Sequence, residues 1–180
     1  MVQADEAIEQ TKRWITDVVI ACNFCPFAAN VVKQQTVFYQ VEHSNEVEVC
    51  LAALLAEAER LDSEINIETS FLIFPDSFAT FDDYLGLVAD AEDLLIENGY
   101  EGVYQLASFH PLYRFADSTE KDAANYTNRS VYPMLHLLRE TSIDKALENY
   151  KDPENIPVNN INFAREKGLV YMKMLRDACF

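Results

Sequence analysis

The chain has 180 residues, of which 49% are hydrophobic and 24% are charged, and its formal net charge at pH 7 is -16. Thirty acidic side chains against 14 basic ones create a field that repels nucleic acid and anionic lipid, so we expect neither as a partner. The four glycines cannot form a Gly-rich dinucleotide fingerprint or a Walker A phosphate loop, which excludes these two kinds of nucleotide site. The length predicts one domain over residues 1–180, and an acidic start without a long apolar segment predicts a cytoplasmic protein without a membrane span.

The first 109 residues alternate between helical and strand patterns. Apolar residues at intervals of three and four predict amphipathic helices, and short runs rich in β-branched and aromatic residues predict strands. The expected helices are 4–21, 47–61 and 81–95, and the expected strands are 36–42, 69–74 and 103–109. Because short connections link the strands to the helices between them, we expect an α/β fold with a short parallel βαβαβ sheet, flanked by N-terminal and C-terminal helices.

A long segment without clear periodicity, residues 110–131, comes after the third expected strand. Loops of this length in compact domains are usually functional or disordered. Its tyrosine, phenylalanine and arginine residues favour a functional loop, because disordered segments are poor in aromatic residues. Beyond this loop we expect helices at 133–140, 142–150 and 160–178, with Pro133 in a first helical turn.

Positive charge is concentrated in and after the long loop. Residues 34–101 contain sixteen acidic residues and one basic residue, Arg60, whereas residues 110–139 contain four basic and three acidic residues and two of the three histidines. A basic region in an acidic protein concentrates small anions at one place. The alternative is that these arginines only neutralise a neighbouring acidic surface.

His110 is the candidate general acid or base of this region. It lies at the carboxyl end of the third expected strand, the edge at which open parallel sheets bind ligands, and an imidazole titrates near neutral pH. The alternative is a structural histidine bonded to a backbone carbonyl. Cys25 is a candidate nucleophile if the fold brings it to His110, and it is otherwise a packed apolar residue.

Six further residues form the candidate ligand-binding set. Arginine side chains hold phosphate or carboxylate groups with paired hydrogen bonds, and Asn and Ser side chains add neutral ones. On the expected helix 133–140, His136 and Arg139 are three residues apart and share a face. The set comprises Arg114, Asn128, Arg129, Ser130, His136 and Arg139. We expect four groups to converge around one anion: His110, Arg129, His136 and Arg139.

The spacing of Cys22 and Cys25 is that of half a zinc site, which two histidines could complete. However, Cys22 also fits the buried stripe of the opening helix, so packing explains it without metal. We therefore expect no metal and assign no cofactor.

Three segments of the chain resemble one known family: Cys25–Ala28, Ser108–Phe115 and Asn125–Glu140. They are similar to segments of the bacterial proteins grouped as domain of unknown function 1415, and the likeness covers nearly the whole chain. The family has an N-x-C-P-F-A motif without a usual cysteine at the position of Cys22, which counts against the zinc site. The resemblance implies no particular reaction, cofactor or partner.

Two functions remain open from the sequence. The first is a protein, catalytic or not, that binds a small anionic metabolite through phosphate or carboxylate at the carboxyl edge of the sheet. A concave pocket with His110 and two arginines would favour it. The second is a noncatalytic interaction or homodimerisation module, which a flat exposed patch of Tyr113, Phe115 and Tyr132 would favour. A homo-oligomer is compatible with both.

Overall fold

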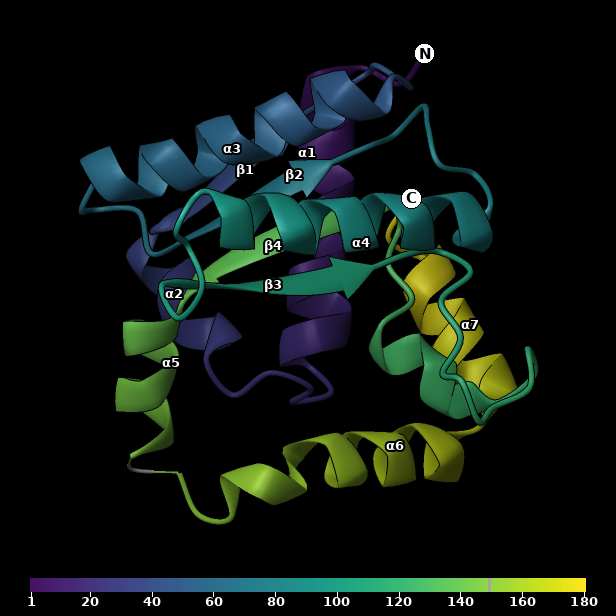
Figure 1. The fold of residues 1–180 in the computed structure, drawn as a ribbon. Coiled ribbons are helices and arrows are strands. Elements are labelled where there is room, and N and C mark those ends of the chain that lie inside the picture. The colour runs from purple at the N-terminus through teal and green to yellow at the C-terminus, as the bar shows by residue number, and fades with distance from the viewer. Residues whose placement is uncertain (149) are drawn as a thin grey trace.

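A four-stranded mixed sheet forms the centre of the protein (Figure 1). The structure is a computed structural model that describes residues 1–148 and 150–180. The strands, β1 (Val37–Val41), β2 (Thr69–Ile73), β3 (Tyr104–Phe109) and β4 (Met134–Arg139), are arranged in the order β1-β2-β4-β3. The helices are α1 (Ala4–Trp14), α2 (Ala28–Gln34), α3 (Val47–Ser63), α4 (Phe81–Glu97), α5 (Glu140–Leu147), α6 (Ile156–Lys167) and α7 (Leu169–Asp177). The protein is thus an α/β protein with helices at both ends of the chain.

The strand β4 is the main departure from the expected sheet. β1 pairs parallel with β2, whereas β4 runs antiparallel to both β2 and β3 and lies between them. The three expected strands therefore point in one direction, as predicted, but the sheet is mixed and β2 does not touch β3.

The prediction of a helix at 133–140 is wrong, because this segment forms β4. Its side chains alternate between two cores: Leu135 and Leu137 pack on one face of the sheet, and Met134 packs on the other. A strand buried on both faces has a nearly continuous apolar sequence, which periodicity alone cannot distinguish from a buried helix. His136 and Arg139 consequently project from opposite faces, since residues three apart on a strand do so.

The C-terminal helical segment also differs from the expectation. The predicted helix 160–178 is divided into α6 and α7 at Gly168, whose φ of 85° suits glycine and few other residues. The opening segment agrees better with the predicted helix 4–21, because α1 continues directly into a π-helical segment, η1 (Ile15–Ile20). The short helix α2 is not expected from the sequence pattern.

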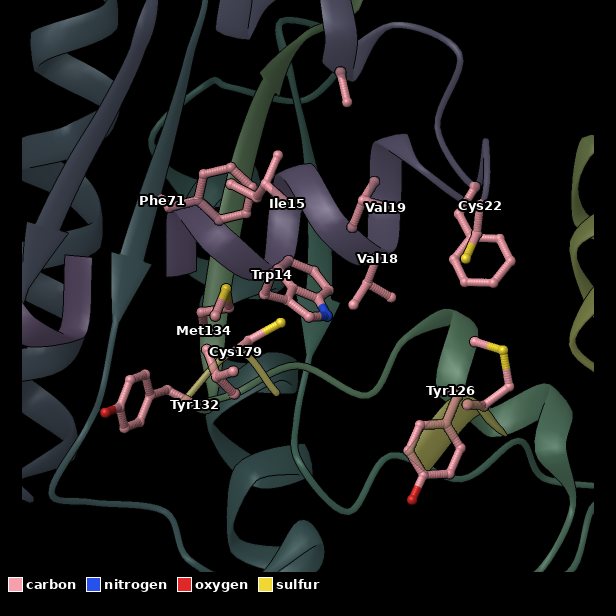
Figure 2. Packing of buried hydrophobic residues seen from close by; sticks show 14 of the residues in the cluster. Trp14, Ile15, Val18, Val19, Cys22, Phe71, Tyr126, Tyr132, Met134 and Cys179 are labelled. Atoms are coloured by element: carbon pink, nitrogen blue, oxygen red, sulfur yellow. The ribbon is translucent and has the colours of Figure 1, made fainter. Parts of the chain in front are cut away.

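Helices cover both faces of the sheet. Figure 1 shows α3 and α4 side by side on one face, which we call the α3/α4 face, and α1 across the other, which we call the α1 face. On the α1 face, Figure 2 shows Trp14 and Ile15 beside Phe71 and Met134 of the sheet. No helix of the described residues is both long and apolar enough to cross a lipid bilayer.

Tyr84 of α4 joins the ends of two strands, and its removal should weaken the fold. Its hydroxyl donates to the carbonyl of Met134 at 2.7 Å and accepts from the N–H of Phe109 at 3.0 Å, and the side chain is fully buried. Tyr84→Phe leaves both backbone groups without this partner, so we expect the free energy of unfolding, measured with urea, to fall by about 2 to 4 kcal/mol.

Tyr100→Phe is the matched control. The Tyr100 hydroxyl donates to Asp62 in an exposed setting, and its loss should cost under about 1 kcal/mol. Equal destabilisation by the two substitutions would contradict the bridging role of Tyr84.

Candidate functional site

A cavity of about 770 Å³ lies on the α1 face of the sheet. We call it the sheet cavity. Its floor is formed by side chains of β2, β3 and β4, and its walls come from η1, from α2 and from α5. In Figure 1, α2 and α5 lie near each other, beside the start of β3. The cavity therefore lies at the amino-terminal part of β1 and β2 and follows β3 along its length to Phe109. It is not centred on the carboxyl edge at which the sequence predicted a ligand.

Strand alternation determines which residues reach the cavity. Successive side chains of a strand point to opposite faces, so every second residue of β2, β3 and β4 faces the α1 side. Three of these positions are in register across the sheet: Phe71 pairs with His136, which pairs with Ala107. The small Ala107 side chain leaves space beside the imidazole ring on the β3 side.

His136 is the central polar group of the cavity floor. Its ring stacks on Phe71 with the ring centroids 3.7 Å apart, and its Nε2 lies 2.5 Å from Oγ1 of Thr69. Burial lowers the pKa of His136 to about 3, so the imidazole is neutral at physiological pH.

Cys25 lines the same cavity from the turn before α2. Burial raises the pKa of its thiol, and the backbone N–H groups of Phe27 and Ala28 offset only part of this rise. The thiol is therefore protonated at neutral pH, and a protonated thiol is a weak nucleophile. The sheet cavity thus contains a neutral imidazole and a neutral thiol, a combination that suits binding better than acid–base or nucleophilic chemistry.

Charged groups occur where β4 leads into α5. Glu68 accepts a hydrogen bond from Ser142 at 2.6 Å. Lys145 of α5 is exposed and has no acidic side chain within 4.0 Å among the residues that the structure describes. Arg139 borders the cavity, but its guanidinium donates to the carbonyls of Leu61 and Ile67 and lies over the ring of Tyr104, on the α3/α4 side.

His110 lies apart from the sheet cavity. It is buried beside α4, where its Nε2 donates to the carbonyl of Phe78 at 2.8 Å and its Nδ1 accepts from the N–H of Leu112 at 2.9 Å. Burial lowers its pKa. Both ring nitrogens are bonded to the backbone, as in the structural alternative, and the fold does not bring Cys25 to it.

Arg129 holds the long loop together. Its side chain is buried, donates to the carbonyls of Tyr113 at 2.9 Å and Glu120 at 3.1 Å, and lies over the ring of Tyr126. Its neighbour Ser130 is also buried and donates to the carbonyl of Tyr132 at 2.5 Å. These contacts are internal to the protein.

The remaining candidates are also separate from the cavity. Asn128 Oδ1 lies 2.9 Å from Thr127 Oγ1, and Arg114 is exposed on the surface of the loop. The predicted convergence of four side chains on one anion is therefore wrong, because their polar groups bond in separate places: His110 beside α4, Arg129 within the long loop, Arg139 on the α3/α4 side, and His136 on the cavity floor. Of the expected set, Cys25, His136 and Arg139 border the sheet cavity.

Sequence reasoning missed the polar and small residues that shape the cavity, Thr69, Gln105 and Ala107. The only signal for Thr69 is its place at the start of an apolar strand. Because the sequence pattern places its partner His136 on a helix, their pairing could not be predicted. Among the described residues, no three His, Cys, Asp or Glu side chains cluster closely enough to hold a metal ion, and the absence of zinc stays a prediction.

Arg129→Ala is expected to destabilise the fold. The substitution leaves two backbone carbonyls without their charged donor and removes the contact with Tyr126, so the free energy of unfolding should fall by about 2 to 4 kcal/mol. Arg114→Ala, at an exposed position of the same loop, should change it by less than about 0.5 kcal/mol. Urea titrations that find the two variants equally stable would show that Arg129 does not support the loop.

His136 is expected to make the protein less stable in mild acid. Its pKa is lowered from 6.5 to about 3, so below pH 6.5 the unfolded chain takes up a proton that the folded protein does not. The contribution of His136 to the free energy of unfolding is thus fully present above pH 6.5 and is lost as the pH decreases. This loss should lower the free energy of unfolding by about 1 to 2 kcal/mol between pH 7 and pH 5. Urea titrations over this range should show that His136→Phe has lost this part of the pH dependence.

Phe71→Leu is the control for that measurement. It removes the ring that stacks on His136 and lowers stability, but it retains the imidazole and should retain the pH dependence. If His136→Phe and the wild type show the same pH dependence, His136 is not the group responsible.

Comparison with known proteins confirms the family resemblance of the sequence. A family model described as "Protein of unknown function (DUF1415)" matches residues 6–174. Neither a search of curated proteins nor a search of solved structures found a match. Since the family model covers nearly all of the 180 residues, the chain belongs to the DUF1415 family.

Proposed function

We propose that the protein binds a small, largely apolar organic acid in the sheet cavity. The observation that carries this proposal is the cavity itself, whose volume of about 770 Å³ lies within the range of small-molecule sites. Like such sites, it combines apolar walls with a few polar groups. The ligand that this geometry favours has an aromatic or aliphatic body and a single acidic group.

Small side chains support a binding role for this space. The cavity is open to solvent on one side, and small side chains at its border keep it from being filled by the protein itself. Ala28, Ala107 and Ala146 border the cavity from α2, β3 and α5, and larger apolar residues at these positions would fill it. A ligand site requires small side chains at such positions, whereas a packed hydrophobic core without a ligand does not.

The position of Lys145 is the argument for a negatively charged ligand. It lies at the cavity in a protein whose net charge is -16, and no acidic side chain of the described residues lies within 4.0 Å of its ammonium group. One ammonium group matches one carboxylate better than it matches a phosphate, whose charge near neutral pH is greater. The anion expected from the sequence therefore stays a proposal, with its position moved to the sheet cavity.

The neutral state of His136 and Cys25 favours binding without catalysis. A general base works best with a pKa near the operating pH, and burial moves the pKa of His136 well below it. The alternative of an interaction surface at Tyr113, Phe115 and Tyr132 has weaker support, because Tyr132 is buried and its hydroxyl donates to Gln10.

The test uses 8-anilinonaphthalene-1-sulfonate, a small apolar anion that fluoresces in apolar sites. We expect saturable binding to the folded wild-type protein and displacement by decanoate. Ala107→Leu, which fills the floor of the cavity, should weaken binding at least about tenfold. Ala52→Leu, at an exposed position of α3 on the opposite face, should bind as the wild type does.

Two further variants make this test specific. Ala146→Phe fills the cavity from α5, so it replaces Ala107→Leu if that variant does not fold. Lys145→Glu should weaken the binding of decanoate, and of the anionic probe itself, about three- to tenfold; the affinity for decanol, calculated with the probe affinity of that variant, should stay unchanged. If the fluorescent probe binds the filled variants as it binds the wild type, the sheet cavity is not the binding site.

A further inference from the structure

The hydroxyl of Thr69 determines which nitrogen of His136 carries the proton. This hydroxyl has one hydrogen, which it donates to the carbonyl of Leu137 at 2.6 Å. Oγ1 can therefore only accept from the imidazole, and Nε2 of His136, 2.5 Å away, must be the donor. Because the ring is neutral, its other nitrogen, Nδ1, carries a lone pair and no hydrogen.

Nδ1 of His136 is an acceptor with no protein partner. None of the described residues donates a hydrogen bond to it, and the atom is not sealed from the space around it. The ring lies on the cavity floor, packed on Phe71 on the β2 side, with the small Ala107 on the β3 side. An acceptor that faces an apolar cavity needs a donor, which a bound molecule can supply.

We infer that the ligand of the sheet cavity carries a hydroxyl or N–H group that donates a hydrogen bond to Nδ1 of His136. This inference rests on the proposed function and specifies the ligand further: it is an apolar acid with a separate hydrogen-bond donor on its body. The Thr69–His136 pair fixes this specificity by holding the imidazole as an acceptor.

The same geometry determines which end of the ligand lies at His136. An ionised carboxylate has only acceptor oxygens, so it is repelled by the lone pair of Nδ1. The acidic group must therefore lie away from the cavity floor, toward Lys145 of α5. His136 and Lys145 thus bind different groups of one molecule and select its orientation.

The test compares two neutral probes with the same naphthalene body, 2-naphthol, which has a hydroxyl donor, and 2-methoxynaphthalene, whose ether oxygen carries a methyl group and can only accept. Affinity is measured near neutral pH by displacement of the fluorescent sulfonate. The wild-type protein should bind 2-naphthol about five- to tenfold more tightly than the ether. In His136→Phe, which preserves a flat ring against Phe71, the two probes should bind equally.

Two other variants show whether the effect is specific to His136. Gln105→Leu removes a different polar group of the cavity lining and should keep the preference for 2-naphthol. Thr69→Val removes the acceptor that fixes the tautomer and should reduce the preference even if His136→Phe fails to fold. Nitrogen-15 NMR of the histidine side chains should show Nδ1 of His136 without a proton.

The outcomes separate this inference from the proposed function. If neither probe nor the fluorescent sulfonate binds the wild-type protein, the proposed function fails and this inference fails with it. If both probes bind the wild type equally, the cavity is a ligand site but His136 does not select a donor. A preference that persists in His136→Phe, or a proton on Nδ1, likewise overturns the inference.

Discussion

The placement of β4 between β2 and β3 is the constraint on which the two cores and the cavity floor depend. Antiparallel hydrogen bonding to both neighbours fixes its register, and its side chains alternate between two cores. Leu135 and Leu137 are thereby committed to the α3/α4 face and His136 to the α1 face. A shift of one residue would exchange the two faces and place the imidazole among the leucines, so packing and the position of the polar group depend on the same register.

The long loop is a consequence of that arrangement. β3 and β4 are neighbours, yet residues 110–133 separate them, and this segment folds into a compact structure of its own. Asn125, fully buried, bonds to Phe115, Ser118 and Thr119, while Arg129 holds two other turns of the loop. Trp14 joins the loop to α1 by donating to the carbonyl of Arg129 at 3.2 Å. Of the polar side chains that suggested an anion site, His110, Arg129 and Ser130 instead bond to backbone groups.

The sheet cavity is the place where the two faces of the sheet differ most. On the α3/α4 face, two long helices fill the surface of the sheet with large apolar side chains. On the α1 face, α1 and η1 cover only part of the sheet, and the short helices α2 and α5 border the rest. Burial of His136 and Cys25 in this region holds both groups neutral, which links the packing of the cavity to the binding role that we propose.

The sequence by itself determined the parts of the fold that depend on local pattern. Helical periodicity and β-branched runs placed α1, α3, α4 and the first three strands, and the segment from Cys25 to Ala28 contributed to the family resemblance. Tertiary structure alone decided that Met134–Arg139 is a strand, because an apolar segment buried on both sides has no period that separates helix from strand. It also decided the pairing of Thr69 with His136, 67 residues apart, since strand order and register come from contacts between distant segments. The local sequence around Thr69 does not predict a contact with His136, and the local sequence around His136 does not predict one with Thr69.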